Sequence, residues 1–193
     1  MMQREAYSEI LNRVNALLSE GREITVAIDG NSGSGKSTLS SLLGNIYDCN
    51  IFHMDDFFLQ PGQRTEDRMK EVGGNVDYVR FKTQVLDKLK KDTEFEYQIY
   101  DCSALRLTDY VVVFPKKLNI VEGVYSMHPT LYNAYDFKIF LQADEEIQRC
   151  RILQRSGEYM LHRFLNEWIP LESKYFSEMN IAKKCDLVLT SLG

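Results

Sequence analysis

The residue types that could do chemistry gather first in a short stretch near the N-terminus. It follows the pattern G-x-x-x-x-G-K-S and consists of Gly30, Asn31, Ser32, Gly33, Ser34, Gly35, Lys36 and Ser37, with Thr38 directly after it. Glycines permit backbone angles at which successive N–H groups point inward, where they bind phosphate oxygens. The lysine of such a loop reaches the β- and γ-phosphates, and the next hydroxyl is a ligand for Mg²⁺. We therefore expect these residues to bind ATP, or another nucleoside triphosphate, together with Mg²⁺.

The stretches on either side of this loop predict the strand and the helix that it requires. Residues 24–28 form a short apolar run rich in β-branched side chains, which indicates a buried strand. Apolar residues then recur at helical spacing from Leu39 to Ile46. A helix that begins at the loop contributes partial positive charge at its N-terminus, where an anion binds. The alternative is a glycine-rich turn that binds nothing, but every fixed position of the pattern is present.

Two groups of acids follow predicted strands directly. Residues 49–54 predict a strand that delivers Asp55 and Asp56, and the buried run 118–121 ends in Glu122. In an open parallel sheet, ligands bind at the carboxyl ends of the strands. We predict that Asp55 is the base for an acceptor hydroxyl, and that Glu122, Ser37 and Asp55 hold Mg²⁺ or its waters. The alternatives are a turn-capping aspartate and a surface glutamate at the end of a strand.

A cluster of arginines lies in the segment 149–163, which contains Arg149, Arg151, Arg155 and Arg163. Arg151 and Arg155 are four residues apart, so on a helix they share a face. Such arginines are usually solvated surface, but beside Gly157 they predict a lid that closes on phosphates. In that role Arg151 and Arg155 stabilise charge on the transferred phosphoryl group, as Lys36 does. The segment 59–75 is a second lid-like stretch, because it combines Pro61-Gly62 and Gly73-Gly74 with a charged run.

The order of the predicted elements indicates the fold class. Helices are expected over 5–19, from 36 onward, after Asp77, over 144–155 and over 161–178 with an interruption at Pro170. Strands are expected at 24–28, 49–54, 95–100, 111–114, 118–121, 137–141 and 187–189. Strands that alternate with helices predict a doubly wound α/β fold with a mostly parallel sheet. No linker-like stretch divides the 193 residues, so a single domain is expected over 1–193.

Composition and charge narrow the function classes. A net charge of −5 at pH 7 makes a nucleic-acid backbone an unfavourable partner. The four cysteines are scattered without metal-ligand spacing, and no apolar run approaches the length of a membrane span. We therefore expect a cytoplasmic protein with reduced thiols. Its expected partner is a small molecule rather than nucleic acid or a membrane, and a homo-oligomer is compatible with this interpretation.

The chain resembles the uridine kinase and phosphoribulokinase family of P-loop kinases, which includes nicotinamide riboside kinases and bacterial pantothenate kinases. The resemblance rests on six pieces in the family's order: 30–37, Met54-Asp55-Asp56-Phe57-Phe58, Asn75-Val76-Asp77, Ile99-Tyr100-Asp101, Val121-Glu122-Gly123 and 149–163. It implies a P-loop NTPase fold with a lid, and ATP-dependent phosphorylation of the 5′-hydroxyl of a ribonucleoside. It also implies that Asp55 is the base and that Glu122 assists Mg²⁺.

The same resemblance implies an acceptor site, which we assign to Asp77, Tyr100, Phe57 and Arg106. Asp77 is implied to contact the ribose hydroxyls, and it also stands where a helix N-cap is expected, so it can have both roles. The family's histidine–serine–arginine run after Tyr-Asp is replaced here by Cys102-Ser103-Ala104-Leu105-Arg106. Without the histidine that reads a pyrimidine, discrimination among bases should depend on shape and on stacking against Tyr100, Phe57 or Phe58.

These features leave several functions to compare. The simplest acceptor is uridine or cytidine. The Asp-Asp-Phe-Phe element and residues 168–170 are similar to the nicotinamide riboside kinases, so nicotinamide riboside, pantothenate or a sugar phosphate is an alternative acceptor. A nucleotide-dependent switch protein is the alternative outside enzymes. The sequence lacks the N-K-x-D motif that reads guanine, and a switch gives the strand-end acids no role.

Overall fold

The computed structural model describes residues 2–191, with side chains from Tyr7 to Thr190. Five parallel strands form its main sheet in the order β2-β5-β1-β6-β7. Their bounds are Ile24–Gly30 for β1, Cys49–His53 for β2, Leu118–Glu122 for β5, Phe137–Ala143 for β6 and Leu187–Ser191 for β7. The sheet, flanked by helices, confirms the predicted α/β fold with a mostly parallel sheet.

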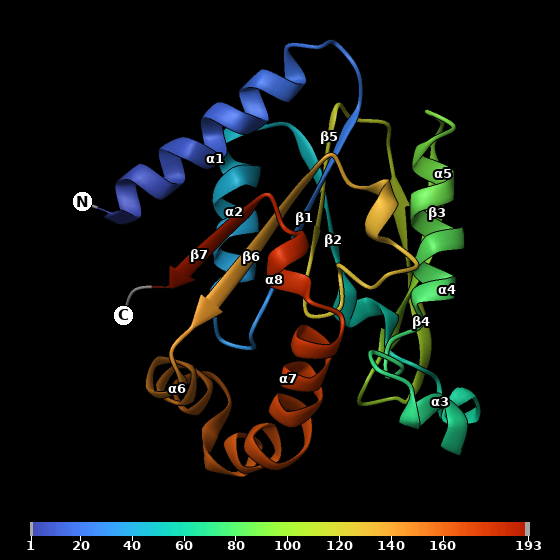
Figure 1. The fold of residues 1–193 in the computed structure, drawn as a ribbon. Helices are drawn as coiled ribbons and strands as arrows, with labels where there is room; N and C mark the ends of the chain where they lie inside the picture. Colours follow the sequence, from blue (N-terminus) through green and yellow to red (C-terminus); the bar gives the residue numbers. More distant parts are fainter. Residues whose placement is uncertain (1, 192–193) are drawn as a thin grey trace.

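Both faces of this sheet are covered, which explains why all seven residues of β1 are buried. Helices α1 (Met2–Leu18) and α2 (Lys36–Ile46) pack on one face, where Ile10, Val14, Leu39 and Leu43 join the strands in one apolar cluster. On the other face lies a helical run of α4 (Tyr78–Phe81), the π-turn η3 (Lys82–Leu86) and α5 (Asp87–Leu89). The two groups of helices lie on opposite sides of the strands in Figure 1.

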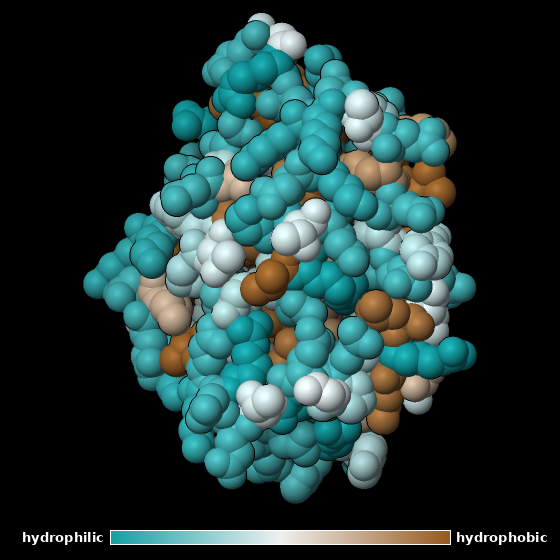
Figure 2. Space-filling view, turned by 90° about the vertical axis from the view of Figure 1, so that its right-hand side faces the viewer, coloured by the Kyte–Doolittle hydropathy of each residue, from teal (hydrophilic) through white to brown (hydrophobic). Residues whose placement is uncertain are grey.

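Two of the predicted strands do not join the main sheet. Strands β3 (Phe95–Asp101) and β4 (Arg106–Val113) pair with each other, antiparallel, in a separate hairpin. Four residues connect them, which is too short for the crossover that a parallel pair requires. Tyr97, Tyr100 and Val113 face the core, and Figure 2 shows that the outer side of this region is mostly hydrophilic with separate hydrophobic patches.

The segment 59–75 is a folded loop. It follows the 3₁₀ turn η1 (Met54–Phe57) and contains a second such turn, η2 (Pro61–Gln63), and the short helix α3 (Glu66–Lys70). Arg68 ties the loop together, because its guanidinium donates to the Val76 carbonyl at 2.8 Å and to the Glu71 carboxylate at 2.8 Å. The same guanidinium lies 4.0 Å from the centre of the Tyr78 ring.

A second long helical run crosses the carboxyl ends of the strands (Figure 1). It consists of α6 (Glu145–Arg163), the π-turn η5 (Phe164–Trp168) and α7 (Ile169–Glu178). The turn η4 (Tyr132–Ala134) and β6 precede this run in the chain, and the short helix α8 (Ile181–Lys184) follows it. Helical backbone continues through Pro170, so the interruption predicted there is a change of helix type and not a break: the π-turn η5 ends at Trp168, just before α7. The break lies at Gly157 instead, with φ 77° and ψ 173°. None of the helices in residues 2–191 is long and apolar enough to cross a membrane.

Candidate active site

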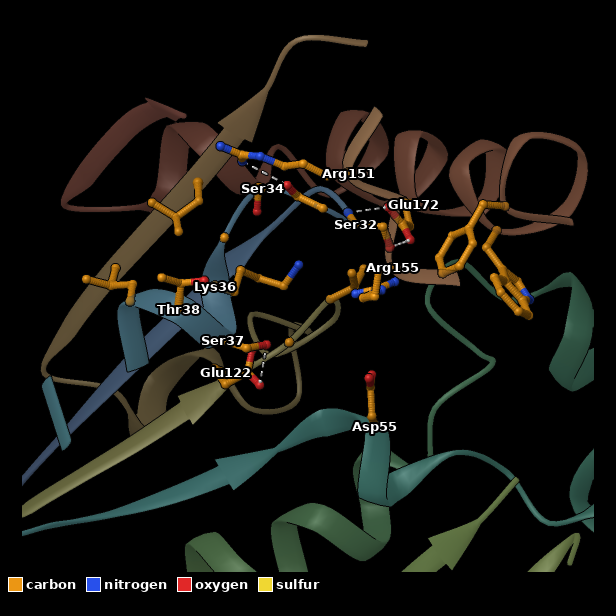
Figure 3. A pocket seen from close by; sticks show the side chains of 18 of the residues that line it. Ser32, Ser34, Lys36, Ser37, Thr38, Asp55, Glu122, Arg151, Arg155 and Glu172 are labelled. Atoms are coloured by element: carbon orange, nitrogen blue, oxygen red, sulfur yellow. Dashed lines mark hydrogen bonds between the residues drawn. The ribbon is translucent and has the colours of Figure 1, made fainter. Parts of the chain in front are cut away.

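A cavity of about 1240 Å³ opens at the carboxyl edge of the sheet (Figure 3). The glycine-rich loop follows the central strand β1, Asp55 follows the edge strand β2, and the opposite edge is β7. The cavity therefore has an acidic end near β2 and an apolar end near β7. The apolar end is lined by Tyr7, Ile10, Leu39, Leu141, Val188, Leu189 and Thr190.

The loop has the open backbone that phosphate binding requires. Gly30 and Gly35 have φ values of 143° and 98°, which favour glycine, and a Cβ on Gly30 would lie 1.9 Å from the Leu141 carbonyl oxygen. The Lys36 ammonium lies over the loop and donates to the carbonyls of Gly30 at 2.8 Å and Asn31 at 2.9 Å. Among side chains 7–190, the Ser34 hydroxyl is one of the few buried groups without a hydrogen-bond partner. Polar groups at the loop are thus available for an anion.

Oxygen donors suited to Mg²⁺ lie beside the loop. The Ser37 hydroxyl donates to the two Glu122 carboxylate oxygens at 3.2 Å and 3.3 Å, and both residues line the cavity with Asp55. Within side chains 7–190, no three His, Cys, Asp or Glu residues converge as a metal cage. Mg²⁺ in phosphoryl-transfer sites is usually bound by one or two protein oxygens, waters and substrate phosphates, so this set of oxygens fits it.

His53 is a neighbour of this acid that the sequence interpretation missed. Its Nδ1 lies 2.6 Å from Glu122 Oε1, and this contact raises the pKa of His53. His53 is the last residue of β2 and pairs in register with Glu122 at the end of β5. The position of His53 at the end of a strand could have predicted this contact, but only if the order of the strands in the sheet had been known.

The two neighbouring aspartates point to different places. Asp55 faces the cavity, where enclosure by the walls and then the charge of Glu122 raise its pKa. Asp56 turns toward the hairpin instead, and its carboxylate accepts a hydrogen bond from the Tyr97 hydroxyl at 3.3 Å. Asp55 therefore lies where a base for an acceptor is needed, and Asp56 lies in the packing between η1 and β3.

The arginines of α6 also separate into two groups. Arg151 donates to the Gly33 carbonyl at 3.0 Å, and Arg151 and Arg155 both line the cavity. Figure 3 shows Arg155 and Asp55 extending into the same space. Arg149 is exposed on the outer side of the helix. Arg163 lines the cavity beyond the break at Gly157. The cations of α6 thus reach both the loop and the acidic end of the cavity.

Helix α7 braces the loop at both ends, an arrangement that the sequence interpretation missed. Glu172 accepts hydrogen bonds from the Ser32 amide at 3.0 Å and from the Ser32 hydroxyl at 2.5 Å (Figure 3). One turn later, the Tyr175 hydroxyl donates to Asp29 Oδ2 at 2.8 Å. Burial raises the pKa of Asp29 to about 6, although Asp29 also accepts from the amides of Gly30 and Met127. The brace fixes the loop on the helical run that carries the arginines.

Removing one hydroxyl tests this brace. Tyr175→Phe keeps the ring but leaves a buried carboxylate with one donor fewer, so the free energy of unfolding should fall by about 1.5–3 kcal/mol at pH 7. At pH 5, below the folded-state pKa of Asp29 of about 6, the carboxyl is protonated, and the loss should shrink to about 0.5–1.5 kcal/mol. Urea unfolding at both pH values measures this, with the exposed Tyr159→Phe as control. A loss that is equal at the two pH values would contradict the role of Asp29.

The four residues assigned to the acceptor from the sequence are absent from the described side chains that line the cavity. Phe57 is fully buried against Phe81 and Tyr97, with ring centroids 4.9 Å and 5.3 Å away. Tyr100 is 3% exposed, and Arg106 is exposed on the hairpin. The neighbours of these residues line the cavity instead: Phe58, Asn75, Cys102 and Ser103.

Asp77, the fourth of these residues, is an N-cap, as predicted. One carboxylate oxygen accepts from the Arg80 amide at 2.9 Å, and the other accepts from the Gln63 side-chain amide at 2.9 Å. Asp77 is 6% exposed, and its carboxylate lies 3.8 Å from the buried Arg80 guanidinium. Both oxygens are therefore engaged within the fold.

Substitution of this cap separates its two predicted roles. We expect Asp77→Ala to lower the free energy of unfolding by about 0.5–2 kcal/mol, because the first turn of α4 loses its cap. The resemblance implies a ribonucleoside acceptor, and if Asp77 is only a cap, the ratio of its KM to that of its 2′-deoxy form should stay as in the parent, since Gln63 and Arg80 already occupy the carboxylate. Denaturant unfolding and the KM values for a ribonucleoside and its 2′-deoxy form measure both effects. A change in the ratio of these KM values would instead place the ribose at Asp77.

The fold and the cavity together define a P-loop kinase. A phosphate loop follows the central strand, acids lie at the ends of the two neighbouring strands β2 and β5, and helix α6, which crosses the ends of the strands, carries arginines. Comparison with known proteins agrees. No family model matches the chain. The chain is 31% identical over 190 residues to uridine kinase of Clostridium novyi (strain NT), and the matched region covers 89% of each protein.

Two further relatives differ in how much they cover. The chain is 28% identical over 147 residues to uridine kinase of Ligilactobacillus salivarius (strain UCC118), which covers 72% of this chain and 69% of that protein. It spans about two thirds of the lactobacillus enzymes that it matches. The fold is similar to the structure of a possible uridine kinase from Bacillus stearothermophilus, with a TM-score of 0.66, 20% identity, and coverage of 94% of this chain and 99% of that one. The chain belongs to the uridine kinase-like family of P-loop kinases.

Proposed function

We propose that the protein transfers the γ-phosphoryl group of ATP to the 5′-hydroxyl of a ribonucleoside, uridine or cytidine. One observation carries the proposal: Asp55 faces the same cavity as the phosphate loop, at its β2 end. Relatives that are uridine kinases support the acceptor class. A bound nucleoside can place its hydroxyl at Asp55 while the rest of the cavity holds the donor.

ATP, the phosphoryl donor, is expected to lie in the cavity with its phosphates at the loop and its base toward β7. Its phosphates bind at the loop amides, the Lys36 ammonium and the N-terminus of α2, because each of these groups favours negative charge. The base of the donor then extends toward the apolar end near β7, away from Asp55. Ser37 and Glu122 would hold Mg²⁺ or its waters, and the ion would supply positive charge next to the bound phosphates.

Catalysis in this site depends mainly on position and charge. Asp55 orients the acceptor hydroxyl and takes up its proton, although its pKa, even when raised, leaves a carboxylate a weak base at neutral pH. Arg151, Arg155 and Lys36 line the cavity, and in this proposal their charges surround the transferred group. Fixed cations in an enclosed site stabilise developing charge without reorganisation, so they contribute more than proton transfer does.

A screen of acceptors tests the proposal. The purified protein is incubated with ATP, Mg²⁺ and one acceptor at a time: uridine, cytidine, nicotinamide riboside, pantothenate or a sugar phosphate. We expect ADP release that depends on uridine or cytidine, with the nucleoside 5′-monophosphate as the product found by mass spectrometry. ADP release that is the same with and without every acceptor, or that depends on pantothenate or the sugar phosphate alone, would refute the nucleoside assignment.

A further inference from the structure

Two aromatic side chains of the π-turn η5, Phe164 and Trp168, line the cavity outside the buried core. They stand at the two ends of the π-turn η5, with ring centroids 4.4 Å apart and planes at 83°. Both are partly buried, and neither belongs to the two buried clusters of the described chain. A π-turn is rare and occurs often at functional sites. Large aromatic surface that no core uses is available to a ligand.

The other aromatic rings at this end of the cavity are already engaged. Tyr125 is 4% exposed and packs against Tyr175, with centroids 4.8 Å apart. Phe58 packs against the buried cluster between the sheet and the hairpin. Phe57 and Tyr100 are buried outside the cavity. Among the described residues, Phe164 and Trp168 thus line this end of the cavity without packing in a buried cluster.

Their position relative to the chemistry is fixed by three neighbours. The Arg155 guanidinium lies 5.5 Å from the centre of the Phe164 ring, and Arg155 extends into the same space as Asp55 (Figure 3). The Arg163 guanidinium lies 4.9 Å from the centre of Trp168. Glu172, four residues after Trp168, is hydrogen-bonded to Ser32 of the phosphate loop. The two rings therefore flank the acidic end of the cavity, next to the transferred phosphoryl group.

We propose that Phe164 and Trp168 form the surface on which the base of the acceptor stacks, so that the enzyme requires an acceptor with a flat ring. The inference rests on the proposed function, which it deepens by naming the residues that read the base. The hairpin tip presents the small side chains of Cys102 and Ser103 to the same cavity. Small side chains leave room for a ring, and stacking tolerates different bases because every base has a π-face.

Intrinsic fluorescence tests the contact directly, because Trp168 is the only tryptophan of the chain. The protein without ATP is titrated with uridine, cytidine, nicotinamide riboside, ribose and pantothenate, with excitation at the red edge of the tryptophan band. We expect at least one ring-bearing compound to quench Trp168 saturably, and ribose and pantothenate to leave the emission unchanged. Absence of a response to every ring-bearing compound overturns the inference, whatever the acceptor screen shows.

Substitutions test whether the stacking contributes to acceptor binding. We expect Phe164→Leu and Trp168→Leu each to raise KM for the nucleoside about tenfold, and KM for ATP to change less than twofold. The matched control is Tyr159→Leu, because Tyr159 is on the same helix, is 78% exposed and lies outside the cavity lining. Trp168→Phe keeps a ring, so it should recover most of the lost affinity. Circular dichroism melting confirms that each variant is folded.

The outcomes separate this inference from the proposed function. If uridine is phosphorylated and both leucine variants keep the parental KM, the stacking surface is wrong and the kinase assignment stands. If no nucleoside is phosphorylated but nucleosides quench Trp168, the proposed function is wrong and the ring-binding surface stands. Equal losses in the leucine variants and in Tyr159→Leu would also overturn the inference, because they would indicate a general effect on the helical run from α6 to η5.

Discussion

Lys36→Ala should reduce kcat by at least about 10²–10³, the cost of removing one fixed group that stabilises transition-state charge. Lys36 is 8% exposed, and its ammonium lies within hydrogen-bond distance of two loop carbonyls. No other lysine lines the cavity in the described residues, so no neighbouring ammonium can replace it. Steady-state kinetics with saturating ATP and acceptor measure the effect.

Two controls make this result specific. Lys174→Ala removes an exposed lysine of α7 and should leave kcat unchanged. Because the Lys36 ammonium also ties loop carbonyls, melting curves of the variant must show that the fold is retained. A folded Lys36→Ala protein with parental turnover would mean that the loop does not bind the transferred phosphate.

Asp55→Asn should lower kcat by about 10²–10⁴, the usual contribution of a positioned general base. The amide keeps the shape of the side chain but removes the charge that accepts the proton. ATP affinity should change little, because the loop, Lys36 and Ser37 are untouched. The comparison variant is Asp56→Asn, whose side chain contacts Tyr97 rather than the cavity, so its turnover should stay within about tenfold of the parent. Single-turnover kinetics and calorimetric titration with ATP distinguish chemistry from binding.

The ranking of the two aspartates is the decisive part of this experiment. An equal loss in the two variants would indicate that η1 as a whole has shifted. A larger loss at Asp56 would mean that the base has been assigned to the wrong carboxylate.

Features that depend on adjacent residues could be predicted from the sequence. The phosphate loop, the strand before it and the helix after it form one local pattern, and the structure has all three in place. Asp55 and Glu122 could be placed at the cavity because each follows a strand, and parallel strands bring their carboxyl ends to one edge. The cap at Asp77 also depends on its neighbours alone.

Features that depend on which way a side chain turns could not be predicted. Phe57 and Phe58 are adjacent, yet Phe57 is fully buried while Phe58 reaches the cavity. Tyr97 and Tyr100 should face opposite sides of a regular strand, because they are three residues apart. Instead, an irregular register between Gln98 and Tyr100 turns both toward the core. The hydrogen bonds of Glu172 and Tyr175 were missed for another reason: no local pattern relates residues so far apart.

The hydrogen bonds from α7 to Asp29 and the phosphate loop also bear on the order in which the site forms during folding. Two of these hydrogen bonds join residues that are 140 and 146 positions apart in the sequence. The central strand β1 likewise cannot pair until β5 and β6 are present, because Ile24 pairs with Leu118 and Val26 pairs with Phe137. Contacts between such distant positions form slowly, because loop-closure entropy opposes them. On the ribosome, the phosphate loop is thus synthesised well before α7 and is completed only after α7 has been made.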